Sequence, residues 1–385
     1  MGRVLNITRR GSSTYSIMSN IKLHQPLHGG DLLAASQRYG IEVNDWLDLS
    51  TGINPEAYPF QGLSAAAFCQ LPYLSPRFYA AAKQYYGVDR LLPTSGSQAV
   101  IQALPHILPL KRLLIPAVGY QEYAKHWLKA GGLTPSYSSF KGVDARVSIE
   151  RALSENSNQH VLVINPNNPT GLQFTSDELL HYSSLLATGA YLIVDEAFAD
   201  LSPADSFLQQ ELPDNVIVLR SFGKFFGLAG VRLGFVMANE RILQALNTRL
   251  GLWQINGPAQ ELAIKALADV AWQQQARDDI ADNADLCEGL FSPLMQASGL
   301  IKGIHCGLFS SYLLDRQTAY NIFEYFARAG ILFRVVEVDE HSAILRIGLF
   351  SKRARQQITK IKQVVAAYCD TANNHVLAQH SVETL

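Results

Sequence analysis

Short apolar runs alternate with longer amphipathic stretches between residues 96 and 235. The apolar runs are rich in Val, Ile and Leu, as buried strands are, and the stretches between them have helical periodicity. Strands that alternate with helices form βαβ units and therefore a mostly parallel sheet. The predicted strands are residues 112–115, 160–164, 190–194 and 216–219.

The hydrophobic pattern changes after residue 239. Amphipathic helices are predicted over residues 240–250 and 258–291, and strand-like runs return at 307–314, 331–336 and 342–347. This order favours a separate α+β unit. The segment from about residue 21 to residue 60 has no sheet-forming pattern of its own, so we expect it to pack with that unit.

These patterns divide the chain into five expected parts. They are a disordered extension (1–20), an N-terminal segment packed with the small domain (21–60), a large α/β domain (61–268), a small C-terminal α+β domain (269–370) and a flexible tail (371–385). The extension lacks the apolar core of a secretory signal. Met18 is an alternative start of the protein, because folded-looking sequence begins just after it.

Composition and charge exclude several classes of partner. The chain has 385 residues, 48% of them hydrophobic, with a formal net charge of −1, so it lacks the basic surface of a nucleic-acid-binding protein. No apolar run approaches the roughly 18 residues that span a bilayer. The cysteines have neither disulfide-framework nor metal-ligand spacing; they are Cys69, Cys287, Cys306 and Cys369. We expect a cytoplasmic protein that binds a small molecule and no metal, nucleic acid or membrane.

Lys224 stands in a glycine-rich run that begins at Ser221 and ends at Arg232, directly after a predicted strand. A lysine amine can bind a cofactor aldehyde covalently, as in pyridoxal-phosphate enzymes. The Ser221 hydroxyl and the Arg232 guanidinium are suitable partners for the phosphate of such a cofactor. A single lysine in such a loop is more often a solvated surface residue. The cofactor hypothesis therefore depends on partners elsewhere in the chain.

Two of these partners follow neighbouring predicted strands. Asp195 begins the run Asp-Glu-Ala-Phe198, and a buried carboxylate there would keep a pyridine nitrogen protonated. A helix N-cap is the alternative interpretation of Asp195. Asn168 lies in the run Asn-Pro-Asn-Asn-Pro-Thr-Gly over residues 165–171, where its amide can donate to a cofactor ring oxygen. A plain turn would explain a single Asn-Pro pair, but the whole run is more specific.

Two further candidates lie earlier in the chain. Gly96, Ser97 and Gln98 precede an apolar helix, whose N-terminal backbone N–H groups would bind a phosphate. An ordinary helix cap is the alternative. Tyr120 can stack its ring on a pyridine face, although an isolated tyrosine usually serves packing. Since ligands of open α/β sheets lie at the carboxyl ends of the strands, we expect all these residues to meet at one site.

With these motifs, the chain resembles the fold-type I pyridoxal-phosphate enzymes of the aminotransferase superfamily over roughly residues 22–368. The resemblance implies a large domain with a mostly parallel seven-stranded sheet between helices, a smaller α+β domain, and pyridoxal 5'-phosphate bound to the large domain. It implies that Lys224 is catalytic and that the cofactor contacts are Gly96, Ser97, Gln98, Tyr120, Asn168, Asp195, Phe198, Ser221, Lys224 and Arg232. It also implies a homodimer with sites at the interface, near which Tyr73 is a candidate contact.

Within the superfamily, the chain most resembles the threonine-phosphate decarboxylases of cobalamin biosynthesis, which in turn are similar to histidinol-phosphate aminotransferases. The run His28-Gly-Gly30 favours the decarboxylases, and so does Phe198, where the superfamily often has a tyrosine. The expected reaction converts L-threonine O-3-phosphate to (R)-1-amino-2-propanol O-2-phosphate. The implied substrate-binding residues are His28, Gly29, Gly30, Asn54, Arg334 and Arg346.

Three questions stay open at this point. An aminotransferase of the histidinol-phosphate type is the alternative enzyme, and a ligand-sensing or structural module is the alternative without catalysis. Either Arg334 or Arg346 could bind the substrate phosphate while the other binds its carboxylate.

Overall fold

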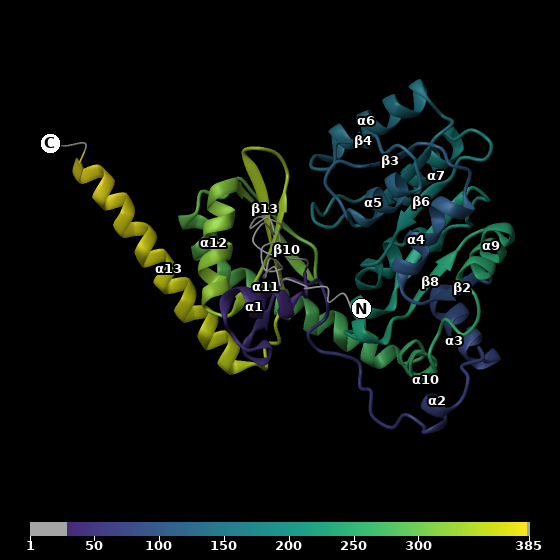
Figure 1. The fold of residues 1–385 in the computed structure, drawn as a ribbon, viewed down its shortest axis with the longest axis horizontal. Helices are drawn as coiled ribbons and strands as arrows, with labels where there is room; N and C mark the ends of the chain where they lie inside the picture. The colour runs from purple at the N-terminus through teal and green to yellow at the C-terminus, as the bar shows by residue number, and fades with distance from the viewer. Residues whose placement is uncertain (1–28, 383–385) are drawn as a thin grey trace, which may run out of the picture.

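The computed structural model describes residues 29–382, with side chains described up to residue 371. The predicted extension over residues 1–20, Met18 and His28 lie outside the described residues. Figure 1 shows two lobes, one built on a seven-stranded sheet and the other on a four-stranded sheet. None of the helices in residues 29–382 combines the length and the apolar character that crossing a membrane requires.

The seven-stranded sheet has the order β2-β8-β7-β6-β5-β3-β4. Its strands are β2 (Leu91–Thr94), β3 (Leu113–Pro116), β4 (Ser136–Tyr137), β5 (His160–Ile164), β6 (Leu192–Asp195), β7 (Val216–Ser221) and β8 (Gly234–Met237). The pairs from β4 to β7 are parallel, and β8 runs antiparallel to both of its neighbours. The prediction of an α/β fold with a mostly parallel seven-stranded sheet is confirmed.

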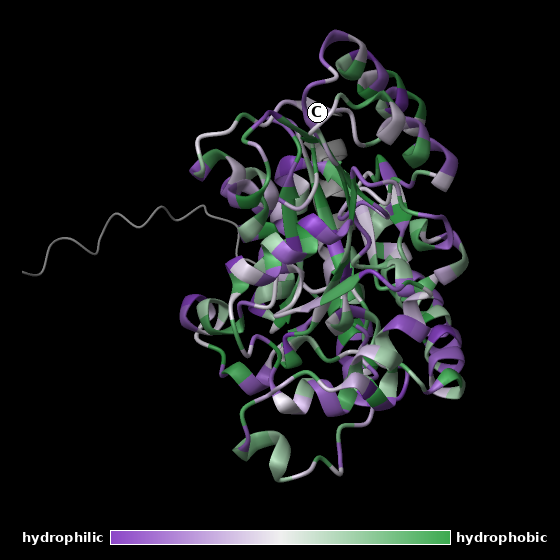
Figure 2. Cartoon of the chain, turned by 90° about the vertical axis from the view of Figure 1, so that its right-hand side faces the viewer, coloured by the Kyte–Doolittle hydropathy of each residue, from purple (hydrophilic) through white to green (hydrophobic). Residues whose placement is uncertain are grey.

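Helices cover both faces of this sheet because its central strands are apolar on both sides. In β5, Leu162 and Ile164 face a core shared with α4 (Ser97–Ile107), α5 (Glu122–Lys129) and α9 (Glu240–Leu250). Val161 and Val163 face the opposite core, which includes residues of α3 (Pro76–Tyr86), α6 (Gly142–Glu155), α7 (Ser176–Leu185) and α10 (Gly257–Ala266). Figure 2 shows the hydrophobic strands enclosed by helices with hydrophilic outer faces.

The smaller lobe contains an antiparallel sheet of order β12-β13-β10-β9. The strands are β9 (Lys302–His305), β10 (Phe309–Asp315), β12 (Arg334–Glu337) and β13 (Ser342–Gly348). They pack with α11 (Val270–Ala297), α12 (Arg316–Arg328) and α13 (Arg355–Val382). Helix α13 continues to Val382 and projects from this lobe (Figure 1), so the helix extends into the region where we expect a flexible tail.

The N-terminal segment pairs with the smaller lobe. Strand β1 (Leu47–Asp48) lies parallel to β11 (Ile331–Leu332), and α1 (Leu32–Tyr39) contacts α12. The single strand that we expect over residues 331–336 is divided at Phe333, because β11 pairs with β1 whereas β12 pairs with β13. This division places Arg334 at the start of β12, beside the larger lobe's strand ends.

Candidate active site

One cavity lies at the carboxyl ends of β5, β6 and β7. Every residue that the sequence assigns to the cofactor lines this cavity, together with five further residues. The lining consists of Gly96, Ser97, Gln98, Tyr120, Ile164, Asn168, Asp195, Ala197, Phe198, Ser221, Gly223, Lys224, Ala229, Arg232 and Leu233. Residues more than 130 positions apart in the chain therefore meet at one place.

Lys224 lies in the short helix α8 (Phe222–Phe225), which follows β7 directly. Burial, together with the positive charges of Arg346 and Arg232, lowers the pKa of Lys224 to about 8, although Asp195 acts in the opposite direction. Its Nζ lies 5.6 Å from the centre of the Phe198 ring. A lysine with a lowered pKa carries an appreciable fraction of neutral amine near neutral pH, and neutral amine is the form that attacks an aldehyde.

Asp195 is the last residue of β6 and is 4% exposed. Its Oδ2 accepts a hydrogen bond of 2.8 Å from the Tyr123 hydroxyl, and its Oδ1 accepts one of 3.1 Å from the backbone N–H of Ala197. Burial raises the pKa of Asp195, while these two hydrogen bonds and the charge of Lys224 lower it. The carboxylate is therefore a buried acceptor that faces the cavity.

The other end of the cavity is built to receive a phosphate. Gly96 caps helix α4 with a φ of 76°, so the first N–H groups of α4 are directed to the cavity. A Cβ at position 96 would lie 2.8 Å from Nη2 of Arg232, so only glycine leaves room for this guanidinium. Arg232 itself has a φ of 57°. Ser97 and Ser221 line the same cavity.

The loop that carries Asn168 is held by its own side chains. Asn165 exchanges two hydrogen bonds with the backbone of Phe174, of 3.0 Å and 2.9 Å, and Asn167 donates to the carbonyl of Val118 at 2.8 Å. This explains why the complete Asn-Pro-Asn-Asn-Pro-Thr-Gly run matters: its other asparagines fix the loop that presents Asn168. The Oδ1 of Asn168 accepts from Arg346, which leaves its amide group available as a donor.

Arg346 lies in β13 and reaches across to the larger lobe. Its Nη1 donates to Oδ1 of Asn168 at 2.7 Å, and its Nη2 donates to the backbone carbonyl of Ser50. Its Nε is buried without a hydrogen-bond partner among the described residues. Burial and the nearby charge of Arg334 lower the pKa of Arg346 to about 10. A buried guanidinium with an unpaired N–H favours a nearby anion, which fits the prediction that Arg346 binds a substrate anion.

Arg334 stands beside Arg346, since the two residues are register partners across β12 and β13. The backbone at Gly29 also approaches Arg346 closely. A Cβ at position 29 would lie 2.6 Å from the Ser50 carbonyl and 3.4 Å from Nη2 of Arg346, and Gly30 N–H donates to Oγ of Ser50 at 2.7 Å. The structure thus places four of the predicted substrate residues, Gly29, Gly30, Arg334 and Arg346, in one region.

Asn54 is bonded to the segment that carries Lys224. Its Nδ2 donates to the carbonyl of Phe225 at 3.0 Å, its Oδ1 accepts from the N–H of Glu56, and its own N–H donates to the carbonyl of Lys224. These contacts hold the Lys224 segment in place and use one of the two N–H groups of the Asn54 amide. The contact between Asn54 and a substrate anion stays a prediction. Tyr73 is 73% exposed, and its ring contacts that of Trp253.

The sequence matches the family described as aminotransferase class I and II over residues 63–360. The chain belongs to the aminotransferase class I and II family. Threonine-phosphate decarboxylases from Pseudomonas aeruginosa and from a Sinorhizobium species are 40% and 38% identical to it, over 84% of this chain and 92% and 93% of the relatives. An adenosylcobalamin biosynthesis bifunctional protein from Leptospira interrogans is 24% identical over 67% of this chain and 31% of that protein.

A solved structure of this fold carries a cofactor. Histidinol-phosphate aminotransferase from Sinorhizobium meliloti, in complex with pyridoxal-5'-phosphate, superimposes with a TM-score of 0.73 over 92% of this chain and 99% of that chain. The two sequences are 19% identical, so this likeness shows the fold alone.

The cavity of this aminotransferase-family chain fits pyridoxal phosphate on its own geometry. A lysine with a lowered pKa, a buried carboxylate and a helix N-terminus with an adjacent guanidinium lie around a single space. These are the partners required by an aldehyde, a pyridine nitrogen and a phosphate. In residues 29–371, no group of His, Cys, Asp and Glu side chains is arranged to hold a metal ion.

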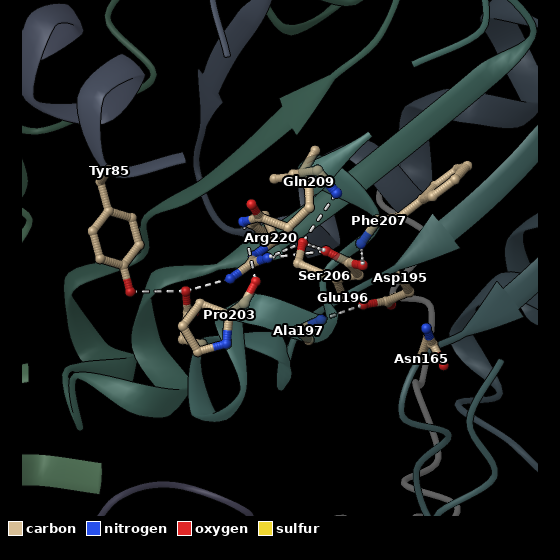
Figure 3. Close-up of polar contacts among 12 residues, drawn as sticks. Tyr85, Asn165, Asp195, Glu196, Ala197, Pro203, Ser206, Phe207, Gln209 and Arg220 are labelled. Atoms are coloured by element: carbon tan, nitrogen blue, oxygen red, sulfur yellow. Dashed lines mark hydrogen bonds and ion pairs between the residues drawn. The ribbon is translucent and has the colours of Figure 1, made fainter. Parts of the chain in front are cut away.

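Two sets of functional neighbours escaped the sequence analysis. One is Tyr123, which bonds to Asp195. The other is Arg220, whose buried guanidinium donates to Glu196 at 2.9 Å and also to Asp200. Figure 3 shows Arg220, Ser206 and Glu196 together, with Asp195 beside Glu196. The sequence offers one hint of the second set: Arg220 directly precedes Ser221, and Glu196 directly follows Asp195.

Proposed function

We propose that the protein is a pyridoxal-phosphate-dependent decarboxylase of L-threonine O-3-phosphate. The product is (R)-1-amino-2-propanol O-2-phosphate, which serves as the aminopropanol linker in cobalamin biosynthesis. The 40% identity to a threonine-phosphate decarboxylase and the partial likeness to an adenosylcobalamin biosynthesis protein support this assignment.

One structural observation supports this proposal. Arg334 and Arg346 form a pair of neighbouring cations beside the cavity, since Arg346 donates to Asn168, which lines it. A cofactor phosphate would use the N-terminus of α4 and Arg232. The charge of the second cationic region suits a substrate that carries two further anionic groups, as threonine phosphate does with its carboxylate and its phosphate.

We assign the cofactor-side residues by their chemistry and their place in the cavity. Lys224 would bind the cofactor aldehyde, Asp195 would accept from the pyridine nitrogen and Asn168 would donate to the ring oxygen. Tyr120 would stack on the ring, and its hydroxyl donates to Oε1 of Gln98 at 3.0 Å. When bound, pyridoxal phosphate supplies an electron sink for the electron pair released at the substrate Cα.

The substrate-side residues select the bond that breaks. Arg334 and Arg346 hold the two anionic groups and so decide which bond at Cα stands perpendicular to the cofactor ring. Gly29, Gly30 and His28 complete this region in the proposal. After carbon dioxide leaves, Cα must gain one proton, and Lys224 in its ammonium form would donate it.

The assembly and location of the protein also belong to the proposal. We assign residues 61–268 to the cofactor-binding domain and residues 269–370 to the small domain, and we propose a cytoplasmic homodimer with sites at the interface. Exposed apolar side chains support a dimer contact around α2 (Ala66–Cys69). They are Phe60, Phe68, Leu71, Tyr73, Leu252 and Trp253. Sedimentation analysis of the purified chain tests this assembly.

The reaction is tested by incubating the purified protein and pyridoxal phosphate with threonine phosphate, with and without a keto acid. We expect release of carbon dioxide and formation of aminopropanol phosphate without any need for the keto acid. Amino transfer that depends on the keto acid, without carbon dioxide, would instead establish an aminotransferase of the histidinol-phosphate type. No reaction and no visible cofactor absorption would favour a non-catalytic module.

A further inference from the structure

A buried tyrosine hydroxyl lies directly behind the carboxylate of Asp195. Tyr123 is 3% exposed and does not line the cavity, yet its hydroxyl donates to Oδ2 of Asp195 at 2.8 Å. The backbone N–H of Ala197 donates to Oδ1. Each carboxylate oxygen therefore accepts one hydrogen bond from the protein and keeps lone-pair capacity toward the cavity.

The Tyr123 hydroxyl opposes the effect of burial on the pKa of Asp195. Burial raises the pKa of Asp195, and the hydrogen bond from Tyr123 is the largest of the contributions that lower it, ahead of Ala197 and the charge of Lys224. Without this donor, a buried carboxyl would hold a proton more readily. A protonated carboxyl is a weaker acceptor for the N–H of a pyridinium ring.

The position of Tyr123 is set by a rigid element. It lies in the first turn of α5, three residues after Tyr120, and its ring belongs to the core that also contains Trp127. In the same turn, Glu122 accepts from Nε2 of Gln98 at 2.7 Å, and Gln98 in turn accepts from Tyr120. One helical turn thus supports both the stacking ring and the carboxylate.

We propose that Tyr123 is a positioning residue for the cofactor, whose hydroxyl orients the Asp195 carboxylate so that its remaining lone pairs face the pyridine nitrogen. This inference rests on the proposed function, because it requires pyridoxal phosphate in the cavity. Tyr123 acts through Asp195 and touches neither cofactor nor substrate.

The test compares cofactor affinity in matched variants of the full chain. Tyr123→Phe removes only the hydroxyl. Tyr137→Phe is the control, because Tyr137 is also buried and donates to a backbone carbonyl, that of Leu162, away from Asp195. Titration of the apoprotein with pyridoxal phosphate, followed by visible absorption, gives the dissociation constants. We expect about tenfold weaker binding for Tyr123→Phe and less than a twofold change for Tyr137→Phe.

A double-mutant cycle separates positioning from general packing. In an Asp195→Ala background, Tyr123→Phe should weaken cofactor binding no further, because the hydroxyl then has no carboxylate to orient. Unchanged affinity and absorption in Tyr123→Phe, or the same tenfold loss in the Asp195→Ala background, would overturn the inference while leaving the proposed function intact. Failure of the unmodified protein to bind pyridoxal phosphate at all would overturn both.

Discussion

Replacing Arg346 by methionine should remove substrate binding while leaving the folded protein almost as stable as before. Arg346 is 8% exposed, and burial and the charge of Arg334 lower its pKa below the ordinary value of arginine, to about 10. At about 1.4 kcal/mol per pKa unit, the charged form is disfavoured in the fold by about 3 kcal/mol. This penalty is fully present at neutral pH. It begins to decline only as the pH rises through about 10, and it is gone only above the ordinary pKa of arginine.

Arg346→Met also loses stabilising interactions, and the loss is similar in size to the gain from removing the buried charge. It removes the hydrogen bonds from the charged Arg346 to Asn168 and Ser50, each of which contributes about 1.5 kcal/mol, the lower end of the range for a charged donor, because both acceptors are neutral. The two terms nearly cancel, so we expect the free energy of unfolding of Arg346→Met to lie within about 1 kcal/mol of the unmodified protein. Chemical denaturation of the apoprotein followed by circular dichroism measures it.

A second buried arginine provides the matched control. Arg220 is 2% exposed but has two carboxylate partners, Glu196 and Asp200. Burial alone would lower the pKa of Arg220, but these carboxylates raise it above its ordinary value. Arg220→Met leaves two buried acids without their cation and should cost about 3–5 kcal/mol. Asp48 acts on Arg346 only as a nearby charge, without a direct ion pair between these two described side chains. An equally large loss for Arg346→Met would therefore show that Arg346 has a strongly coupled carboxylate partner in the free protein, and would refute the expected near-neutral effect.

The functional effect of Arg346→Met should be far larger than its effect on stability. Two charge-assisted hydrogen bonds to a substrate anion contribute about 3–6 kcal/mol in total, which corresponds to a loss of at least about a hundredfold in kcat/KM. Threonine phosphate should raise the Tm of the unmodified protein and not that of the variant. An equal rise in both proteins would refute the assignment of Arg346 to the substrate.

Three shorter predictions concern the cofactor side of the cavity. Lys224→Ala should abolish decarboxylation and the visible absorption of the bound cofactor, while the variant still binds pyridoxal phosphate weakly in dialysis. Because the pKa of Lys224 is lowered to about 8, the rate of cofactor capture by the apoprotein should rise as the pH is raised through 8; a flat profile in stopped-flow absorption would contradict this. Gly96→Ala should weaken cofactor binding at least tenfold, since its Cβ would lie 2.8 Å from Arg232. The control is Gly87→Ala. Gly87 has a similar φ of 67° but open space around it, so this variant shows the effect of backbone strain alone.

The parts of the fold that could be predicted are those with an uninterrupted local pattern. Strands β3, β5, β6 and β7 were predicted within three residues of their observed ends, because their apolar runs are buried on both faces. Strand β2 was missed because Pro93 interrupts its run, which is possible only because β2 lies at the sheet edge. The break at Phe333 was missed because the apolar pattern continues across it.

Residues of the candidate site also divide into those that belong to a local sequence motif and those defined only by contacts in the folded chain. Lys224, Asn168 and Asp195 each belong to a short motif, so their chemistry could be inferred before their positions were known. Tyr123 looks like any buried tyrosine of an amphipathic helix, and it contacts a residue 72 positions away. No local pattern reveals such a contact. The Nε of Arg346, buried without a hydrogen-bond partner among the described residues, is likewise a property of the folded chain alone.

The two lobes divide the chemistry between them. The residues proposed for the cofactor lie on the seven-stranded sheet and its loops, whereas Arg334 and Arg346 lie on the smaller lobe and approach Gly29 of the N-terminal segment. Cofactor motifs alone therefore cannot distinguish a decarboxylase from an aminotransferase. Since Arg346 bonds to Asn168, the substrate region is tied directly to the cofactor region. An anion that binds Arg346 should thus weaken its hydrogen bond to Asn168, so the amide that we propose for the cofactor would respond to the substrate.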